Sequence, residues 1–242
     1  YANRALILKH WKLFVLLGVL FVPLANGIIY VAYNFTTALN GGVVSASQPA
    51  LTVILSWLLF RDLINWKQGV GILVAAAGVF AILTRGDPAA LLHLQFNIGD
   101  LMMIVATLFI AMHNVLLRLV PAAIRILPLL VVIQLTGLVV AAPFYIAETI
   151  FYRPVPVTPE TIAAMLWVGV AVTVLAVGLT NTAVRIIGAN KASMGNYLRA
   201  GFTAILAILV LGEQFQTFHA VGLVLVIGGV FLMTRSHRRK AA

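Results

Sequence analysis

Long apolar runs separated by short polar segments dominate the chain. Eight of them are long enough, at about 1.5 Å per helical residue, to cross a hydrocarbon core about 30 Å thick. They cover residues 13–38, 43–60, 67–84, 98–118, 127–149, 161–184, 190–212 and 217–234. The pattern predicts an all-α polytopic membrane protein with eight transmembrane helices in this chain.

The composition supports this class. The mean hydropathy is +1.08, and 62% of the 242 residues are hydrophobic while 9% are charged, which excludes an ordinary soluble globular protein. The absence of cysteine excludes disulfides and thiol chemistry. With no His/Glu metal spacing either, we expect no cofactor and no metal site.

Basic residues account for the net charge of +10. If the segment before Trp11 lies in the cytoplasm, Arg85 and Arg153 fall outside and Arg199 falls within a span. The other thirteen of the sixteen lie inside, namely Arg4, Lys9, Lys12, Arg61, Lys67, Arg118, Arg125, Arg185, Lys191, Arg235, Arg238, Arg239 and Lys240. This positive-inside pattern predicts a cytoplasmic C-terminus. The lipid bilayer, and not nucleic acid, is therefore the expected partner of these charges.

The chain resembles itself at an offset of 151 residues. The offset pairs Gly18 with Gly169 and Asp62 with Glu213, and it also pairs the triplets 78–80 and 229–231, which are both Gly-Val-Phe. Each copy has three such spans, and two more precede the second copy, so the unit has five helices. An odd number of helices inverts the second copy.

This repeat predicts the organisation of the chain. Residues 1–86 form a first repeat that lacks its first two helices, and residues 87–242 form a second repeat of five transmembrane helices. The expected fold is thus an inverted repeat of five-helix units, with ten helices in the parent and eight in this chain.

Arg199 stands inside an apolar run, where a cation costs a few kcal/mol. Asn196, Arg199 and Thr203 are spaced by three and four residues, so a helix places them on one face. Because a charged side chain in a membrane helix normally faces protein or water, we expect this face to line a site.

The first copy carries a matching polar face. Ser45, Gln48 and Thr52 correspond to Asn196, Arg199 and Thr203 at the same offset, and Pro49 follows Gln48. Inverted repeats bring such faces together near the midplane, so the match favours a central cavity over ordinary interhelical hydrogen bonding.

Further candidates lie on neighbouring spans. Tyr30 and Tyr33 belong to a polar and aromatic stripe that either lines a cavity or forms interhelical hydrogen bonds. Asn181 corresponds to Tyr30 in the second copy. His113 either binds a ligand or proton or packs with hydrogen bonds.

Three further expectations concern turns, acids and glycines. The segment 40–42, Asn-Gly-Gly, predicts a tight external turn. Asp100 should cap the helix that it begins, and all six acids lie near span ends, which leaves coupling to His113, to the upstream helices or to none. The glycine-rich runs 67–84 and 217–234 favour close helix packing or a homodimer.

The residues resemble the drug/metabolite transporter superfamily, specifically the EamA-type exporters. The resemblance rests on the proline-bearing helix from Gln48-Pro49 to Phe60-Arg61-Asp62, the glycine-rich helix after it, and Leu211-Gly212-Glu213. Arg61-Asp62 stands in place of the usual Gly-Glu, and Arg199-Ala200 stands where the family often has a proline. The resemblance implies a multi-pass exporter in the bacterial inner membrane, most similar to exporters of amino acids, including aromatic ones.

These observations predict a secondary transporter that exports small metabolites, foremost amino acids, by alternating access. Arg199 would bind the substrate carboxylate through two parallel hydrogen bonds. The remaining substrate-binding candidates are Gln48, Asn196, Asn181, Tyr30, Tyr33, Ser45, Thr203 and His113. The alternatives are a passive channel or facilitator and an exporter of other metabolites or drugs. An intramembrane enzyme is disfavoured because the chain has no nucleophile elbow and no pair of buried aspartates, and the inverted repeat argues against a receptor.

Overall fold

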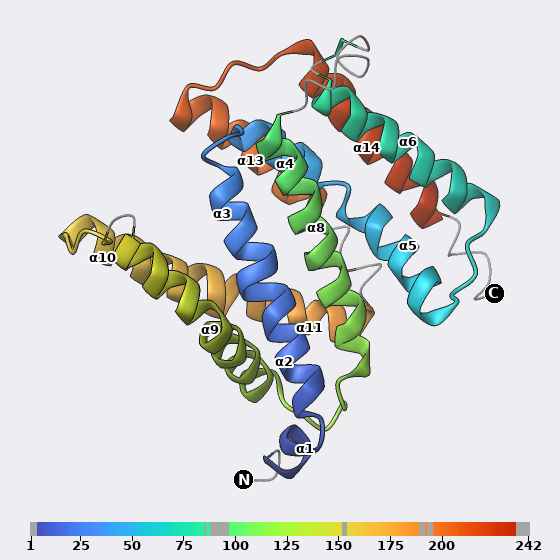
Figure 1. Cartoon of the computed structure of the whole chain (residues 1–242). Coiled ribbons are helices and arrows are strands. Elements are labelled where there is room, and N and C mark those ends of the chain that lie inside the picture. The colour runs from blue at the N-terminus through green and yellow to red at the C-terminus, as the bar shows by residue number, and fades with distance from the viewer. Residues whose placement is uncertain are drawn as a thin grey trace. The chain divides into compact units, whose positions relative to one another are not determined.

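The computed structural model describes residues 4–84, 86–87, 97–151, 154–188, 192 and 196–235, and every regular element in them is a helix (Figure 1). The described residues form two compact units, one within the ranges 1–24 and 116–192 and one within the ranges 25–115 and 193–242. Several of the basic residues that determined the predicted orientation lie outside the described part, namely Arg85, Arg153, Lys191, Arg238, Arg239 and Lys240.

The described helices confirm an all-helical, multi-pass membrane protein. Five are long and apolar enough to cross a bilayer, and they cover Trp11–Ala32, Ala38–Phe60, Ile98–Leu119, Ile126–Phe151 and Pro159–Ile187. Two shorter apolar helices cover Trp66–Ile82 and Thr217–Leu232. The predicted run 190–212 contains one more helix, Asn196–Leu211.

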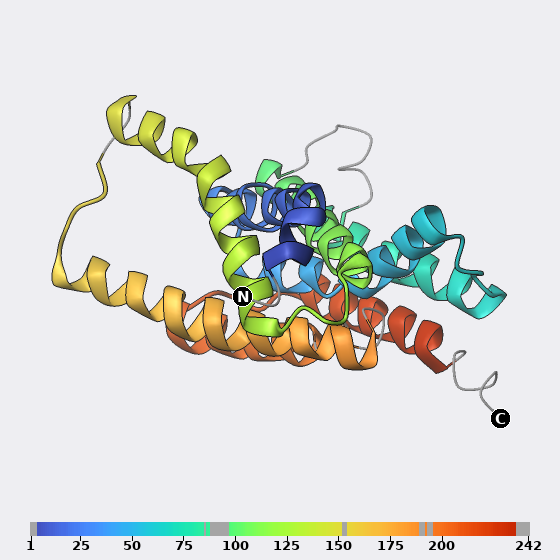
Figure 2. The same cartoon turned by 90° about the horizontal axis from the view of Figure 1, so that it is seen from below.

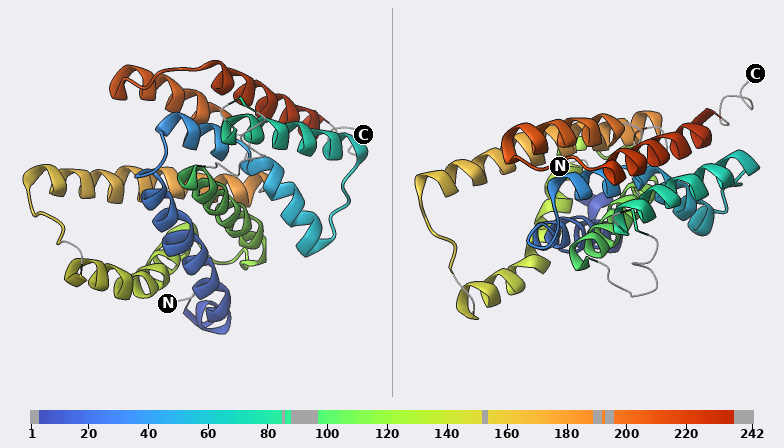
Figure 3. Two further views of the ribbon diagram at one scale, coloured as in Figure 1. Left: turned by 45° about the horizontal axis from the view of Figure 1, so that its top comes forward. Right: turned by 90° about the horizontal axis from the view of Figure 1, so that it is seen from above.

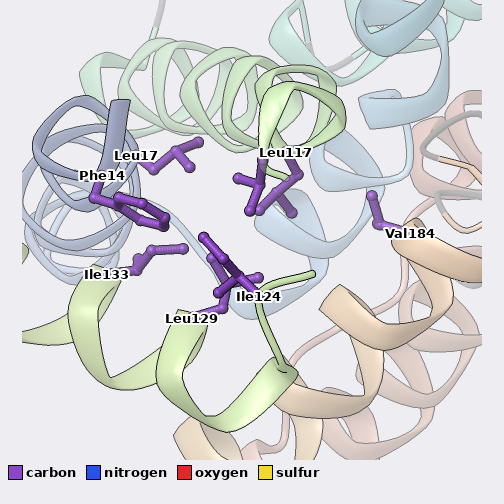
Figure 4. Close-up of a cluster of buried hydrophobic side chains, with 8 residues drawn as sticks. Phe14, Leu17, Leu117, Ile124, Leu129, Ile133 and Val184 are labelled. Atoms are coloured by element: carbon purple, nitrogen blue, oxygen red, sulfur yellow. The ribbon is translucent and has the colours of Figure 1, made fainter. Parts of the chain in front are cut away.

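The first unit is built mainly from α2 and the segment from 116 to 192. Its elements are α1 (Arg4–Lys9), α2 (Trp11–Val19), η2 (Leu117–Leu119), α9 (Ile126–Phe151), α10 (Pro159–Trp167), η3 (Val168–Val177) and α11 (Gly178–Ile187). Figure 2 shows α10, η3 and α11 as one long helical rod. The core of the unit joins Phe14 and Leu17 of α2 to Leu129 and Ile133 of α9 and to Val184 of α11 (Figure 4).

A glycine pair brings α2 and α9 into close contact. A Cβ atom on Gly18 would lie 2.7 Å from the backbone nitrogen of Gly137, and one on Gly137 would lie 2.7 Å from the carbonyl oxygen of Gly18. Thr136 Oγ1 donates to the carbonyl of Phe14 at 3.1 Å. Small residues thus allow two backbones to approach, as is usual between membrane helices.

The second unit contains most of the predicted site. Its elements are α3 (Ile28–Ala32), α4 (Ala38–Ser45), α5 (Gln48–Phe60), α6 (Trp66–Leu83), α8 (Ile98–Leu116), α13 (Asn196–Leu211) and α14 (Thr217–Arg235). Its largest apolar cluster joins Val43 and Val44 of α4, Ile82 of α6, Met103 of α8 and Val226 of α14.

The expected turn at 40–42 is wrong, because Asn40, Gly41 and Gly42 are helical residues of α4. Thr37 caps this helix by accepting a hydrogen bond from the N–H of Asn40 at 3.2 Å. A Cβ atom on Gly41 would lie 3.0 Å from the Tyr33 hydroxyl and 3.0 Å from Met103 Cε. The glycine serves close packing inside a helix here, whereas the sequence pattern indicated a turn.

The two glycine-rich helices α6 and α14 pack side by side (Figures 1 and 3). A Cβ on Gly78 would lie 2.7 Å from the Gly222 carbonyl oxygen, and a Cβ on Gly229 would lie 2.5 Å from the Ala75 nitrogen and also meet the Gly71 carbonyl. At the 151-residue offset, Gly71 corresponds to Gly222 and Gly78 to Gly229. Each helix therefore uses the same two positions against the other, and the sequence direction of one opposes that of the other. The close helix packing that the glycines favoured is confirmed for α6 and α14.

The helices before α6 and α14 end in the same way. Arg61 ends α5 in the left-handed conformation with φ 55°, and its repeat equivalent Gly212, just after α13, has φ 67°. The next N–H reaches six residues back in both cases, from Asp62 to the Ser56 carbonyl at 3.5 Å and from Glu213 to the Ala207 carbonyl at 3.1 Å.

Because a left-handed conformation strains a residue with a Cβ atom, we expect Arg61→Gly to raise the free energy of unfolding by about 1 kcal/mol. The reciprocal change, Gly212→Arg, should lower it by about 1 kcal/mol. Thermal denaturation of the two variants in the same detergent provides the measurement. Equal melting temperatures for wild type and both variants would contradict the strain argument.

The two spans that correspond at the 151-residue offset, 13–38 and 161–184, each contain a wide helical segment. Residues Leu20–Gly27 form the π-helix η1, which includes Pro23, and Val168–Val177 form the π-helix η3. The 151-residue offset carries 20–27 onto 171–178, so the two segments overlap over most of their length. Because proline cannot donate a backbone hydrogen bond, Pro23 explains the wide turn in η1. No proline explains η3.

Candidate functional site

A buried polar network joins three helices of the second unit. Asp100, in the first turn of α8, is 0% exposed. Its Oδ1 accepts a hydrogen bond from the Thr36 hydroxyl, and both of its carboxylate oxygens lie 3.2 Å from Asn40 Nδ2, which donates to them. Asn40 Oδ1 lies 2.9 Å from His219 Nε2 on α14. A carboxylate, an amide and an imidazole therefore form one continuous chain.

The ring of His219 has a defined tautomer in this arrangement. Its Nδ1 lies 3.0 Å from the backbone nitrogen of Gln216, whose N–H can only donate. Nδ1 must then be the unprotonated acceptor, and Nε2 carries the proton that it donates to Asn40 Oδ1. The same choice leaves the Asn40 amide nitrogen free to donate to Asp100, so all assignments in the chain agree.

Glu213 fixes the beginning of α4 from the loop between α13 and α14. Its Oε1 accepts from the N–H of Ala38 at 2.8 Å and its Oε2 from the N–H of Leu39 at 2.9 Å. These N–H groups have no partner within a helix, and a carboxylate at a helix N-terminus also interacts favourably with the helix dipole.

The predicted residues Tyr33 and Arg199 lie near each other. Tyr33 ends α3 and interacts electrostatically with both Arg199 and Glu213. Arg199, in the first turns of α13, has an exposed side chain. Arg199 and Tyr33 of the predicted site therefore lie in the same region. Glu213, which also interacts with Tyr33, binds the first turn of α4.

The predicted polar face on residues 45–56 surrounds a break in the helix. The helix α4 ends at Ser45 and α5 begins at Gln48. Pro49 causes the break, because it has no N–H for the carbonyl of Ser45 and its ring would clash with that carbonyl. Ser47 Oγ donates instead to the Val44 carbonyl at 2.6 Å. The polar side chains around the break are buried, namely Ser45, Ser47, Gln48, Thr52 and Ser56.

The other predicted residues occupy different environments. Tyr30 is 59% exposed, whereas His113 of α8 is fully buried. Thr203 is half-buried on α13, and Asn196 begins that helix with a side chain outside the described part. Asn181 belongs to α11 of the first unit, where its Nδ2 is buried without a hydrogen-bond partner among the described residues.

Sequence reasoning missed the network for two identifiable reasons. From the sequence we expected Asp100 to cap its own helix; Asp100 lies in the first turn of α8 and also binds Thr36 and Asn40, which the local sequence does not indicate. Asn40 was not recognised as a network residue, because the sequence Asn-Gly-Gly indicated a turn. A helical interpretation of that segment would have placed Asn40 one turn after Thr36, on the same face.

Comparison with known proteins identifies relatives along nearly the whole chain. The EamA-like transporter family matches residues 2–84 and 97–235. The chain is 29% identical to the "Uncharacterized transporter YetK" of Bacillus subtilis (strain 168), over 82% of this chain and 60% of that protein. It is 28% identical to the "Uncharacterized transporter YyaM" of the same organism, over 92% of this chain and 72% of that protein.

A solved structure shares the fold. This crystal structure of another protein aligns with 96% of this chain and 78% of its own, with a TM-score of 0.61 and 18% sequence identity. The helical arrangement is therefore found in at least one experimentally determined structure, while the identity is too low for the likeness to carry more than the fold.

Proposed function

The chain belongs to the EamA-like transporter family, and on that basis we propose that it is a secondary transporter that exports small metabolites, foremost amino acids, across the bacterial inner membrane. Transport proceeds by alternating access. The observation that carries the proposal is Arg199, a cation within an apolar helix that lies near Tyr33 at the end of a neighbouring helix.

The repeated contacts support alternating access. Two helices at the 151-residue offset pack through the same pair of glycine positions, and the helices before them end with equivalent left-handed caps. Equivalent contacts made in opposite directions are expected of an inverted repeat. In such a fold the substrate site opens to each side in turn as one repeat rocks against the other.

The broken span supports a polar substrate. Transporter sites commonly use discontinuous helices, whose ends present partial charges near the middle of the bilayer. Between Ser45 and Gln48, the negative end of α4 meets the positive end of α5 within one span. Opposite partial charges together with the Arg199 guanidinium suit a zwitterion whose carboxylate the arginine holds by two hydrogen bonds.

The test is counterflow of radiolabelled amino acids in liposomes that contain the full-length protein. We expect saturable exchange by the wild type and a loss of at least about tenfold in Arg199→Ala, because one charge-assisted bidentate contact supplies more than the 1.4 kcal/mol that a factor of ten requires. Arg199→Lys should retain partial exchange, since it keeps the charge and loses the second hydrogen bond.

Lys12→Ala is the matched control, because Lys12 is an exposed cation whose nitrogen lies 5.9 Å from the centre of the Trp11 ring. It should exchange like the wild type. Full activity of Arg199→Ala would exclude the carboxylate-binding role. Flux that does not saturate with any amino acid would identify a channel in place of a carrier.

A further inference from the structure

Resting on this proposed function, we propose that Asp100 and His219, joined by Asn40, form the proton-binding site that couples export to proton entry. On the predicted topology, the network lies at the ends of α3 and α13 and at the beginnings of α4, α8 and α14, and all of these face the cell exterior. External protons would thus reach the network from the side on which a proton gradient supplies them.

The network can accept a proton without losing its order. Asp100 holds its charge through donors, two of which are the Thr36 hydroxyl and the Asn40 amide. A hydroxyl group both donates and accepts. When Asp100 gains a proton, Thr36 can rotate to accept from the new O–H, and Asn40 can still donate to the other carboxyl oxygen. The carboxyl therefore has a partner in both protonation states.

His219 gives the second protonation step a mechanical effect. Its unprotonated Nδ1 accepts the Gln216 N–H, and both groups would donate once Nδ1 gains a proton. Protonation therefore breaks this bond at the beginning of α14. Gln216 lies three residues after Glu213, whose carboxylate holds the first turn of α4. A proton on His219 thus loosens the segment that fixes α4.

The repeat supplies an internal comparison for His219. In α6 the equivalent residue is Gln68, whose Oε1 accepts the N–H of Asn65 at 2.9 Å, just as His219 Nδ1 accepts the N–H of Gln216. Glutamine therefore performs the structural part of this role. The second copy has a titratable ring at that position instead, and Asn40 joins this ring to the buried carboxylate of Asp100.

Several ionisable groups surround the network. His219 interacts electrostatically with Asp100 on α8 and with Glu213 in the loop before α14. Tyr33 at the end of α3 interacts electrostatically with Glu213 and with Arg199 on α13. The exposed Asp87 follows Gly86, whose added Cβ would lie 3.3 Å from Phe218 Cβ. The helices α4 and α5 carry no charged residue, and Lys67 is at the far end of α6, about 21 Å along the helix from the level of His219.

The test separates coupling from transport. The liposomes have an interior that is one pH unit more acidic than the bath. Valinomycin and equal potassium concentrations on both sides hold the membrane potential at zero. The amino acid that the counterflow experiment identifies is then added to the bath. One-for-one antiport then accumulates substrate inside about tenfold, since one pH unit corresponds to a factor of ten. We expect the wild type to do so, and Asp100→Asn and His219→Gln to lose most of this accumulation while exchanging substrate at equal pH.

Two features of the variants make the result specific. His219→Gln keeps the cap that Gln68 demonstrates and removes the titration, and Asp100→Asn keeps the shape of the side chain. Asp87→Asn removes an exposed carboxylate near the beginning of α14 and should accumulate substrate like the wild type. Accumulation by Asp100→Asn equal to that of the wild type would overturn the proposal. If the wild type exchanges amino acids but does not accumulate them in response to the pH gradient, the proton-coupling proposal is overturned and the proposed function still stands.

A second measurement does not depend on transport. Infrared difference spectra of the purified full-length protein between acidic and alkaline pH should contain a protonated-carboxyl band that Asp100→Asn removes and Asp87→Asn retains. If no amino acid exchanges, the proposed substrate class fails, and this band still decides whether the site binds a proton. A wild-type spectrum without an Asp100-dependent band rejects the site.

Discussion

Gly229→Ala is expected to lower the free energy of unfolding by about 3 kcal/mol. The new Cβ would lie 2.5 Å from the Ala75 nitrogen and would also meet the Gly71 carbonyl, and neither backbone atom can rotate away. The helices α6 and α14 must therefore separate or shift, and overpacking of this kind costs about 1–3 kcal/mol. Unfolding of the purified protein in mixed micelles with increasing denaturant measures the loss.

Gly228→Ala is the matched control for this change. It alters the preceding residue of the same helix, and a Cβ there would meet no atom within 4 Å. Because alanine favours a helix over glycine by about 1 kcal/mol at most, this variant should be as stable as the wild type or slightly more stable. If the two alanine variants lost equal stability, the effect would come from helix propensity or the lipid surface, and the interhelical contact would not explain it.

Glu213→Ala should have the next largest effect, a loss of about 2–4 kcal/mol. The substitution removes the acceptors of two N–H groups, those of Ala38 and Leu39, and a hydrogen bond to a charged group contributes about 1.5–3 kcal/mol. The first turn of α4 should also open more often. Hydrogen exchange of the amides at positions 38 and 39 reports this opening directly, because it depends on local as well as global stability.

Graded variants distinguish the cap from a general effect of charge. Glu213→Gln keeps one oxygen acceptor and should lose about half as much stability as Glu213→Ala. Glu160→Gln changes an exposed carboxylate in the first turn of α10 and should leave the stability close to that of the wild type. Unchanged exchange at positions 38 and 39 in Glu213→Ala would show that the carboxylate does not hold this turn.

Local sequence patterns predicted the features that depend on a single helix. Apolar runs gave the helices, because a helix in a bilayer must be apolar over its whole length and little else has that pattern. Pro49 inside the run 43–60 marks the point where α4 gives way to α5. The spacing of Arg199 and Thr203 likewise requires no knowledge of neighbouring helices.

The network depended on contacts that no local pattern contains. Asp100 and Asn40 are 60 residues apart, and His219 follows Asn40 by 179 residues. At the end of a span, an acid that caps its helix and an acid that bonds to another helix have the same local sequence. The prediction of a turn at 40–42 was wrong for a related reason. Glycine favours turns when it is considered alone, and it favours close packing where another helix approaches.

The repeated glycine contact between α6 and α14 also indicates at which positions the two copies could exchange glycine for alanine after the duplication. Gly71 and Gly78 face the other helix, and their counterparts are glycines too. By contrast, Gly69 and Gly228 meet no atom within 4 Å, and their counterparts are Ala220 and Ala77. Under the proposed duplication, these positions of α6 and α14 have diverged where a methyl group has room and have kept glycine where it does not. A comparison of α6 with α14 therefore identifies the constrained face of these two helices from a single sequence.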